Sequence, residues 1–331
     1  NIPGHPTVLR ILDGPAQSSG LKPGDEIVAV DGKPTAGRSF EDVRNSIRGP
    51  DGQSVKITVK RPGSDQPMDF TIQRAQIQAP VFEAGIIGGT VGYMHIYSFP
   101  QGLQSQVYSA IQTFEQRGVT SILLDLRANT GGDHQTILTL LSYFIKSGTV
   151  ESETDRNGQS QPFTVDGSTY WKSPKPVVVL VDDDTQSGGE LFAKAMQEEG
   201  GYPIFGMKTA GCAASARTFD LGDGSAIEIS TGKIVSGKGA DINRTGVTPD
   251  QVVDYPVTDL AAGRDPQLGA AAQAAAARAT SGQGAAAPMP ASASPQAATS
   301  SAPASGQPPP PSSGPAVIKP LIKPNGVPVL K

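Results

Sequence analysis

The sequence predicts a small β-rich module, an α/β core and a C-terminal tail outside the fold. Up to about residue 76, Gly and Pro turns separate short strands in which apolar and polar residues alternate. From residue 89 onward, apolar strands alternate with amphipathic helices. The last part of the chain is dominated by Pro, Ala and Ser. We therefore divide the chain into residues 1–76, 77–280 and 281–331.

In the first module, the alternation predicts strands at residues 7–12, 26–30, 55–60 and 68–74, with a helical turn at residues 16–20. Ser39 is a suitable N-cap for a second helix, because its hydroxyl can accept a hydrogen bond from a first-turn N–H. Phe40, Val43 and Ile47 form the apolar stripe of that helix. The pattern indicates a β-rich module.

The core shows strand, turn and helix in repeated order. Strands are expected at residues 91–99, 121–126 and 176–181, and helices at residues 101–116, 137–144, 190–197 and 265–279. The strands at 121–126 and 176–181 are continuous apolar runs, which are typical of buried parallel strands. In such α/β folds, ligands bind at the C-terminal ends of the strands, so we expect the functional site there.

The composition excludes several classes of protein. The chain has 331 residues and a formal net charge of −4, so it lacks the basic footprint of a nucleic-acid-binding protein. No apolar run approaches the roughly 20 residues that span a bilayer. The single cysteine, Cys212, excludes an internal disulfide and a cysteine-rich zinc site. His5, His95 and His134 are too far apart for a metal motif, and no cofactor is expected.

The C-terminal tail is expected to be disordered. It carries no acidic residue and contains a run of prolines at residues 308–311. This composition offers too little apolar surface to offset the conformational entropy that is lost on ordering. We therefore exclude residues 281–331 from the predicted fold.

Ser187 is the leading candidate for a reactive residue. It lies in the turn between the strand at 176–181 and the next helix, and Gly188 and Gly189 follow it. A serine in such a turn has the backbone N–H groups of a helix N-terminus beside it, which can stabilise an oxyanion. The pattern fits a nucleophile, and an ordinary helix N-cap is the alternative interpretation.

A second strand-to-helix loop has the sequence RANTGG at residues 127–132. Gly131 and Gly132 free the backbone to point N–H groups at a ligand. A tight structural connection between the strand and the helix is the alternative interpretation.

Several stretches resemble a known family. The first module contains GLKPGDEI, VDG and IRGPDG, and the core contains LLDLRANTGG, VDDDTQSGGELFAKAMQ and GMKTAG in the same order and spacing. The chain is similar to the C-terminal processing (tail-specific) serine proteases, and its first module resembles their PDZ domain. The resemblance implies an α/β protease core of the ClpP/crotonase-like type. It also implies a serine-type endopeptidase that acts on protein C-termini.

The resemblance also implies site residues in the core. In that family the serine of a T-x-S-x-x-E turn is the nucleophile, which corresponds to Ser187. The N-x-G-G loop and the amide after the serine form the oxyanion hole, which corresponds to Gly131, Gly132 and Gly188.

For the PDZ domain, the resemblance implies a groove that binds the C-terminus of a protein or peptide substrate as an added strand. Phe40, Val43 and Ile47 are expected to line it. The strand and carboxylate-binding loop that open such a domain are expected before Asn1. The family resemblance further suggests a periplasmic, secreted or lumenal location.

The chain departs from the family at the general base. The family follows with G-x-x-T-x-G-K, in which the lysine is the base and a glutamine four residues later orients it. Here Cys212 occupies the lysine position and Ala216 the glutamine position. A Ser–Lys pair works because burial lowers the lysine pKa until a neutral amine can accept the serine proton, which a neutral thiol cannot do. Cys212 is expected to be a small buried residue instead.

Three explanations for the altered base stay open. The base comes from elsewhere, as in the tricorn-type proteases, where a histidine before the PDZ domain would lie upstream of Asn1. Alternatively, the chain is a catalytically dead peptide-binding pseudoprotease, or the lysine was removed by engineering, which the additional change at Ala216 disfavours. His134, at a helix start near the glycine loop, is either a base or a polar surface residue. His95 is expected to pack or to line a groove.

Overall fold

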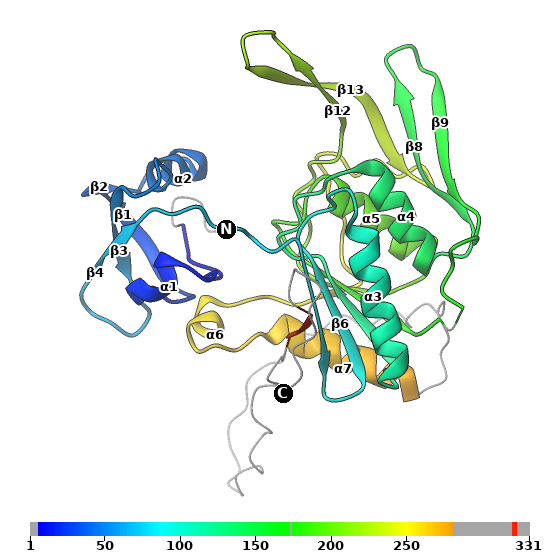
Figure 1. Cartoon of the computed structure of the whole chain (residues 1–331), viewed down its shortest axis with the longest axis horizontal. Coiled ribbons are helices and arrows are strands. Elements are labelled where there is room, and N and C mark those ends of the chain that lie inside the picture. Colours follow the sequence, from blue (N-terminus) through cyan, green and yellow to red (C-terminus); the bar gives the residue numbers. More distant parts are fainter. Residues whose placement is uncertain (1–5, 173, 281–319, 323–331) are drawn as a thin grey trace, which may run out of the picture.

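The computed structural model describes residues 6–172, 174–280 and 320–322, and Figure 1 shows the first module separate from the core. The module is a four-stranded antiparallel sheet in the order β2-β1-β3-β4. Its strands are β1 (Glu26–Val30), β2 (Lys33–Pro34), β3 (Ser54–Lys60) and β4 (Met68–Gln73). The strand expected at residues 7–12 is reduced to one bridge between Thr7 and Glu26.

Two short helices, α1 (Pro15–Ser19) and α2 (Phe40–Ile47), complete the module. As expected, Ser39 caps α2, since its side chain accepts the Asp42 N–H at 3.1 Å. Val43 is buried in the apolar core of the module, whereas Phe40 is 60% exposed. The expected apolar stripe is therefore divided between the core and the surface.

The core is built on a seven-stranded sheet in the order β14-β11-β10-β7-β6-β5-β15. Within this sheet, neighbouring strands among β14, β11, β10, β7 and β6 pair in parallel, and β5 pairs antiparallel with β6. These strands are β5 (Phe82–Ile87), β6 (Val91–Ile96), β7 (Ser121–Asp125), β10 (Val177–Val181), β11 (Ile204–Gly206) and β14 (Gln251–Val252). All residues of β6, β7 and β10 are buried, as the continuous apolar runs predict.

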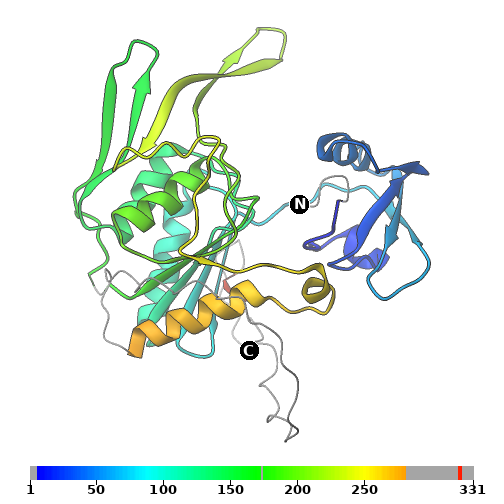
Figure 2. The same ribbon diagram turned by 180° about the vertical axis from the view of Figure 1, so that it is seen from behind.

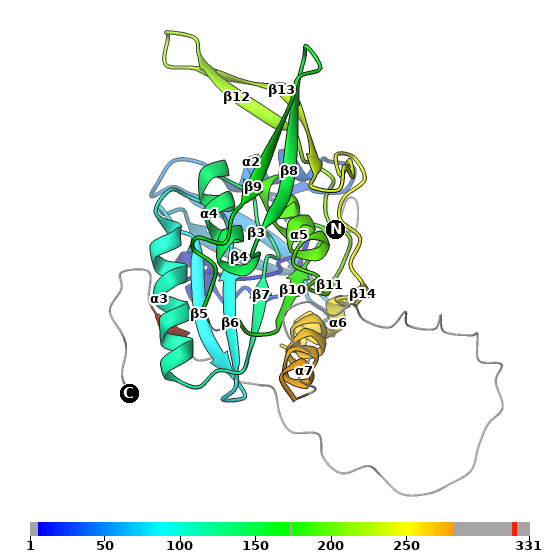
Figure 3. The ribbon, with the colours of Figure 1, turned by 90° about the vertical axis from the view of Figure 1, so that its right-hand side faces the viewer.

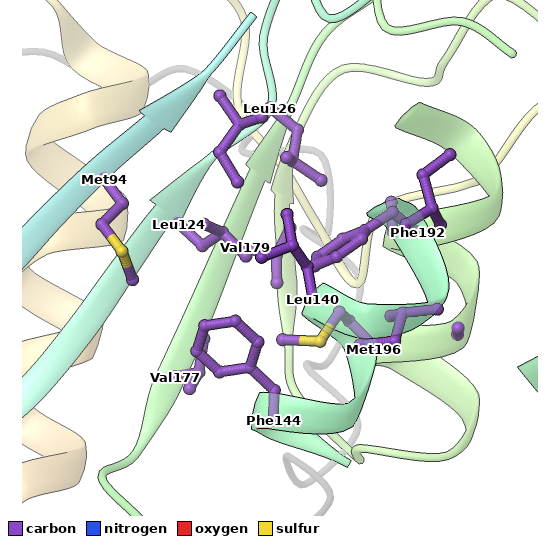
Figure 4. Close-up of a cluster of buried hydrophobic side chains, with 14 of the residues drawn as sticks. Met94, Leu124, Leu126, Leu140, Phe144, Val177, Val179, Phe192 and Met196 are labelled. Carbon is purple, nitrogen blue, oxygen red and sulfur yellow. The ribbon is translucent and has the colours of Figure 1, made fainter. Parts of the chain in front are cut away.

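Helices cover both faces of this sheet (Figure 3). On one face lie α3 (Leu103–Gln116), α4 (His134–Phe144) and α5 (Gly188–Glu198), and on the other lies α7 (Pro266–Thr280). Leu124 and Val179 pack with Phe192 and Met196 of α5 in the larger core (Figure 4). The first residues of α4 and α5 therefore lie at the C-terminal ends of the parallel strands.

Two hairpins form a third sheet that projects beyond α4 and α5 (Figures 1 and 2). Its order is β12-β13-β8-β9, all antiparallel, from β8 (Gly148–Asp155), β9 (Ser160–Val165), β12 (Ser215–Asp220) and β13 (Ala226–Ser236). The sequence did not predict these strands or β5. Their pairing joins distant segments, and β9 is largely exposed, so no apolar run marks it.

At the end of the chain, a short helix α6 (Val257–Ala261) leads toward α7. Within the tail that was expected to be disordered, β15 (Pro320–Ile322) instead pairs antiparallel with the edge strand β5. For residues 281–319 and 323–331, which lie outside the described residues, disorder stays a prediction. Within the described ranges, no helix is long and apolar enough to cross a membrane.

Candidate active site

Two loops follow the neighbouring strands β7 and β10 and lie side by side at the C-terminal edge of the sheet. Residues 127–133 connect β7 to α4, and residues 182–187 connect β10 to α5. The Ala128 N–H donates to Asp182 Oδ1 at 2.9 Å, and the Gln186 N–H donates to the Asn129 carbonyl at 2.9 Å. The structure therefore brings together the two loops that the sequence singled out.

Ser187 has an unusual backbone conformation, with φ of 54° and ψ of −126°. Positive φ is strained for a residue with a side chain and persists where the surrounding structure enforces it. Here the residue immediately precedes α5, and its N–H donates to Glu190 Oε2 at 3.2 Å. The half-buried serine is held at the start of the helix.

The glycine loop packs directly against this serine. A Cβ on Gly131 would lie 2.9 Å from Ser187 Oγ and 2.7 Å from the Gly188 nitrogen, so only glycine fits at this approach. Asn129 holds the loop in place, because its side chain donates to the Ile96 carbonyl and accepts the Gly131 N–H. Gly131 therefore serves as a packing residue and its N–H is not free.

Gly132 and Gly188 are left with backbone N–H groups that have no hydrogen-bond partner within the described parts of the chain. A Cβ on Gly188 would lie 3.5 Å from the Gly132 nitrogen, so the two amides are close neighbours. Gly188 is also the first residue of α5, where the helix dipole favours negative charge. Two free donors beside a serine hydroxyl can bind an oxyanion.

Glu190 joins the turn that carries Ser187 to the loop after β11. It is fully buried, and its carboxylate accepts the Ser187 N–H, the Thr209 hydroxyl at 2.5 Å, the Gly211 N–H at 2.7 Å and the Cys212 N–H at 2.7 Å. The N–H groups of Ser187 and Cys212 share one oxygen, Oε2. The residue in the family's lysine position is thus held next to the serine through its backbone.

The side chain of Cys212 differs from expectation. Cys212 is exposed, although a small buried residue was expected. The cause is local: its N–H is fixed by Glu190 while Gly211 and Ala213 on either side are buried, which leaves its side chain at the surface. Ala216 is also exposed, at the start of the β12–β13 hairpin.

His134 is the first residue of α4, directly after the glycine loop. Its Nε2 forms a hydrogen bond with Glu151 of β8, whose side chain is 2% exposed, and its ring packs edge-on against Phe163. The hydrogen bond to Glu151 raises the pKa of His134, and burial opposes the rise. His134 is therefore anchored to a buried carboxylate, which an ordinary surface residue would not be.

Two aspartates at the ends of adjacent strands have opposite pKa shifts. Asp125 ends β7, and although burial alone would raise its pKa, the Arg127 guanidinium at 2.7 Å lowers it to about 2. For Asp182, after β10, burial raises the pKa to about 6. Among the described residues no cation pairs with Asp182, which explains the difference.

His95 belongs to the network around Asp125. Its Nε2 contacts the Arg127 carbonyl at 2.9 Å, and its Nδ1 contacts the hydroxyl of Tyr93, which donates to Asp125. Burial lowers the pKa of His95. As expected, this histidine packs and lines a cavity, and it helps to fix the start of the glycine loop.

A groove of about 600 Å³ runs from the first module to the core. Phe40, Val43 and Ile47 of α2 line one side of it, and Ala128 and Thr130 of the glycine loop line the other. Among the described residues, no cluster of three His, Cys, Asp or Glu side chains could hold a metal ion.

Two segments of the chain match known families. Residues 90–253 match peptidase family S41, and residues 9–61 match the PDZ domain. The carboxyl-terminal-processing protease of Synechocystis sp. is 30% identical over 255 residues, which cover 76% of this chain and 59% of that protein. The carboxy-terminal processing protease CtpB of Bacillus subtilis is 30% identical over 246 residues, which cover 73% and 51%. The chain thus spans somewhat more than half the length of these relatives.

Solved structures agree with the expected architecture. A photosystem II D1 C-terminal processing protease aligns with a TM-score of 0.57 and 25% identity, over 78% of this chain and 72% of that chain. The expected PDZ domain and α/β protease core are confirmed. Two residues with clear structural contacts, Glu190 and Glu151, were not recognised from sequence. The S-x-x-E spacing of a capping box could have identified Glu190, whereas nothing near Glu151 marks its contact with His134.

Proposed function

This chain belongs to peptidase family S41, and on that premise we propose that it is a serine endopeptidase acting on protein C-termini. In this proposal Ser187 is the nucleophile, and Gly132 and Gly188 supply the oxyanion hole that Gly131 shapes. The PDZ domain guides the substrate, and no cofactor is required. The general base differs from the lysine of the family.

One observation carries the proposal: a strained serine stands beside two free backbone donors. Ser187 Oγ attacks the scissile carbonyl carbon, and the carbonyl oxygen becomes an oxyanion that accepts from the Gly132 and Gly188 N–H groups. Each such donor typically raises kcat by a factor of about 10²–10³. The serine proton passes through the base to the leaving amine, and water then hydrolyses the acyl-enzyme.

The groove between α2 and the glycine loop supports guidance by the PDZ domain. It extends from the exposed ring of Phe40 to Thr130, one residue before the glycine that touches Ser187. A peptide whose C-terminus lies along α2 can therefore present an upstream bond to the serine. The expected peptide contacts at Phe40, Val43 and Ile47 fit this path.

We also infer an extracytoplasmic location. The relatives include bacterial processing proteases and a chloroplastic peptidase of Arabidopsis thaliana. Fractionation of the source cells with an antibody to the chain tests this inference directly.

The activity is tested with an internally quenched peptide that ends in apolar residues and a free carboxylate. We expect slow cleavage by the unmodified chain and background rates for Ser187→Ala. The same peptide with polar C-terminal residues should be cleaved several-fold more slowly, because its contacts with the apolar groove along α2 are lost. Cleavage that persists in Ser187→Ala contradicts the assignment of the nucleophile.

The second candidate function is a peptide-binding pseudoprotease, which the exposed Cys212 in place of lysine favours. In that case the unmodified chain binds the quenched peptide, as measured by fluorescence polarisation, but does not cleave it. Cleavage above the Ser187→Ala background excludes this candidate.

A further inference from the structure

His134 lies on the face of α4 that is turned toward the nucleophile. One helical turn along α4, at i+3, the side chain of Ile137 covers Gly188: a Cβ on Gly188 would collide with Ile137 Cδ1. Residues three apart lie on the same face of a helix, and their side chains tilt toward its N-terminus. His134 therefore extends that face beyond Ile137, at the end where Gly132 and Ser187 lie.

The pairing of His134 leaves one ring nitrogen available. A carboxylate can only accept, so the bond to Glu151 places the proton of the neutral ring on Nε2. Nδ1 then carries the lone pair, and within the described residues no group binds it. Phe163 packs against the ring, which stays 40% exposed. This is an oriented imidazole with a free basic nitrogen.

The same strand also reaches the altered base loop. Glu153 lies two residues after Glu151 on β8, and it accepts a hydrogen bond from the Ser215 hydroxyl at 2.6 Å. Ser215 follows Cys212 by three residues. Strand β8, beside α4 in Figure 1, therefore contacts both His134 and the loop that carries Cys212.

We propose that His134, oriented by Glu151, is the general base for Ser187 in this chain. The inference rests on the proposed function. As Ser187 Oγ bonds to the carbonyl carbon, its proton moves to Nδ1 of His134, and Glu151 stabilises the imidazolium. His134 then gives that proton to the leaving nitrogen as the C–N bond breaks. In the second half of the reaction it takes a proton from the attacking water and returns it to Ser187.

A fluorophosphonate probe tests the proposal without knowledge of the natural substrate. It reacts with an activated serine, with loss of fluoride, and mass spectrometry locates the adduct. We expect Ser187 to be labelled in the unmodified chain, and His134→Gln to lower the rate constant about 10²–10⁴-fold. Glutamine can still donate to Glu151 but cannot take the proton. Gln135→Ala, at the exposed neighbour on α4, is the matched control and should label normally.

A rescue variant separates a catalytic role from a structural one. Adding Cys212→Lys and Ala216→Gln to His134→Gln should restore labelling of Ser187, because the usual base then replaces the histidine. Labelling of His134→Gln within about three-fold of the unmodified chain overturns the proposal and leaves the proposed function intact. If Ser187 is labelled in the rescue variant but not in the unmodified chain, His134 is not a base, and the pseudoprotease interpretation holds. If neither is labelled, the proposed function fails as well.

The pH dependence gives a second readout. Glu151 and Glu153 of β8 and Asp133, which caps α4, face His134, and all three raise its pKa. Labelling should therefore rise with pH through a midpoint above the ordinary value of 6.5. Glu151→Gln should move that midpoint to lower pH, because the largest contribution to the raised pKa is removed. An unchanged midpoint in Glu151→Gln contradicts the role of the pair.

Discussion

The nucleophile loops, residues 127–133 and 182–187, carry the proposed nucleophile and the glycines beside it, and the base loop, residues 207–216, carries Cys212 and Ala216. The carboxylate of Glu190 binds backbone N–H groups of the second nucleophile loop and of the base loop, but the two regions differ in which side chains of the family pattern they keep. In the nucleophile loops, the serine and glycines of the family pattern are present and closely packed. In the base loop, Glu190 binds the N–H groups of Gly211 and Cys212, while the side chains of Cys212 and Ala216 are exposed. The backbone is held in place in both regions, whereas the residues of the family pattern are kept only in the nucleophile loops.

The difference shows which parts of each loop the fold depends on. Glu190 recognises backbone N–H groups, which every residue except proline supplies, so a change at 212 leaves the loop in place. Around Ser187, by contrast, any added atom on Gly131 meets the nucleophile. The nucleophile loops therefore depend on particular residues, and the base loop depends on its backbone.

The largest effect is expected for Gly131→Ala. Its Cβ would enter the space between Ser187 Oγ and the Gly188 nitrogen, at a φ of +81° that disfavours alanine. Labelling of Ser187 by fluorophosphonate should fall at least about 10²–10³-fold. Gly118→Ala is a matched control, since Gly118 also has positive φ but nothing lies within 4 Å of an added Cβ. Equal losses in the two variants would show that backbone strain, and not obstruction of the site, causes the effect.

Glu190→Gln should be next, and it tests whether one carboxylate joins both loops. The amide NH₂ would replace an acceptor oxygen, so at least one buried N–H or hydroxyl loses its partner. We expect the free energy of unfolding to fall by about 2–4 kcal/mol, as measured by urea denaturation. Glu198→Gln, on the same helix and paired with Lys194, should cost clearly less. A comparable loss in both variants contradicts the special position of Glu190.

Asp182→Asn should change how stability depends on pH. The folded pKa of Asp182, about 6, lies above the ordinary 3.8. As pH rises from about 4 to 6, the unfolded chain therefore loses this proton first, and stability falls by up to about 3 kcal/mol. Asparagine keeps the acceptor that Ala128 and Thr185 use, without the charge. The advantage of Asp182→Asn in unfolding free energy should thus grow up to about pH 6 and then level off.

Asp125 provides a contrast of opposite sign. Its pKa is lowered to about 2, so its stabilisation is present above 3.8 and is lost only as pH falls toward 2. Of these two aspartates, only Asp182 therefore changes the stability between pH 5 and 8. A constant difference between Asp182→Asn and the unmodified chain over this range and down to pH 4 would contradict the raised pKa.

The smallest effect is expected for Phe40→Ala, which touches neither loop. Removing this exposed ring from the groove should raise KM for a peptide with an apolar C-terminus roughly 3–10-fold, about 1 kcal/mol. Labelling of Ser187 by the small probe should not change. Tyr108→Ala, a similarly exposed aromatic residue on α3, should alter neither quantity. A fall in the labelling rate of Phe40→Ala would mean that α2 influences the nucleophile itself.

The sequence alone determined the elements with strong periodic signals. The apolar runs predicted β7 and β10, and the spacing from Ile137 to Phe144 predicted α4, because burial of apolar side chains sets these patterns. The repeated order of strand, turn and helix predicted a functional site at the C-terminal ends of the strands. The motifs then indicated Ser187 and the glycine loop as a site.

Only the tertiary structure decided the contacts between segments far apart in the chain. The hydrogen bond between Glu190 and Cys212 joins residues 22 positions apart, and that between His134 and Glu151 joins residues 17 positions apart. Neither contact leaves a local sequence pattern, because each depends on how distant segments meet after folding. The raised pKa of Asp182 and the exposure of Cys212 follow from the same packing. Periodicity records which side of an element is buried, whereas partners and pKa values depend on what the fold brings to that side.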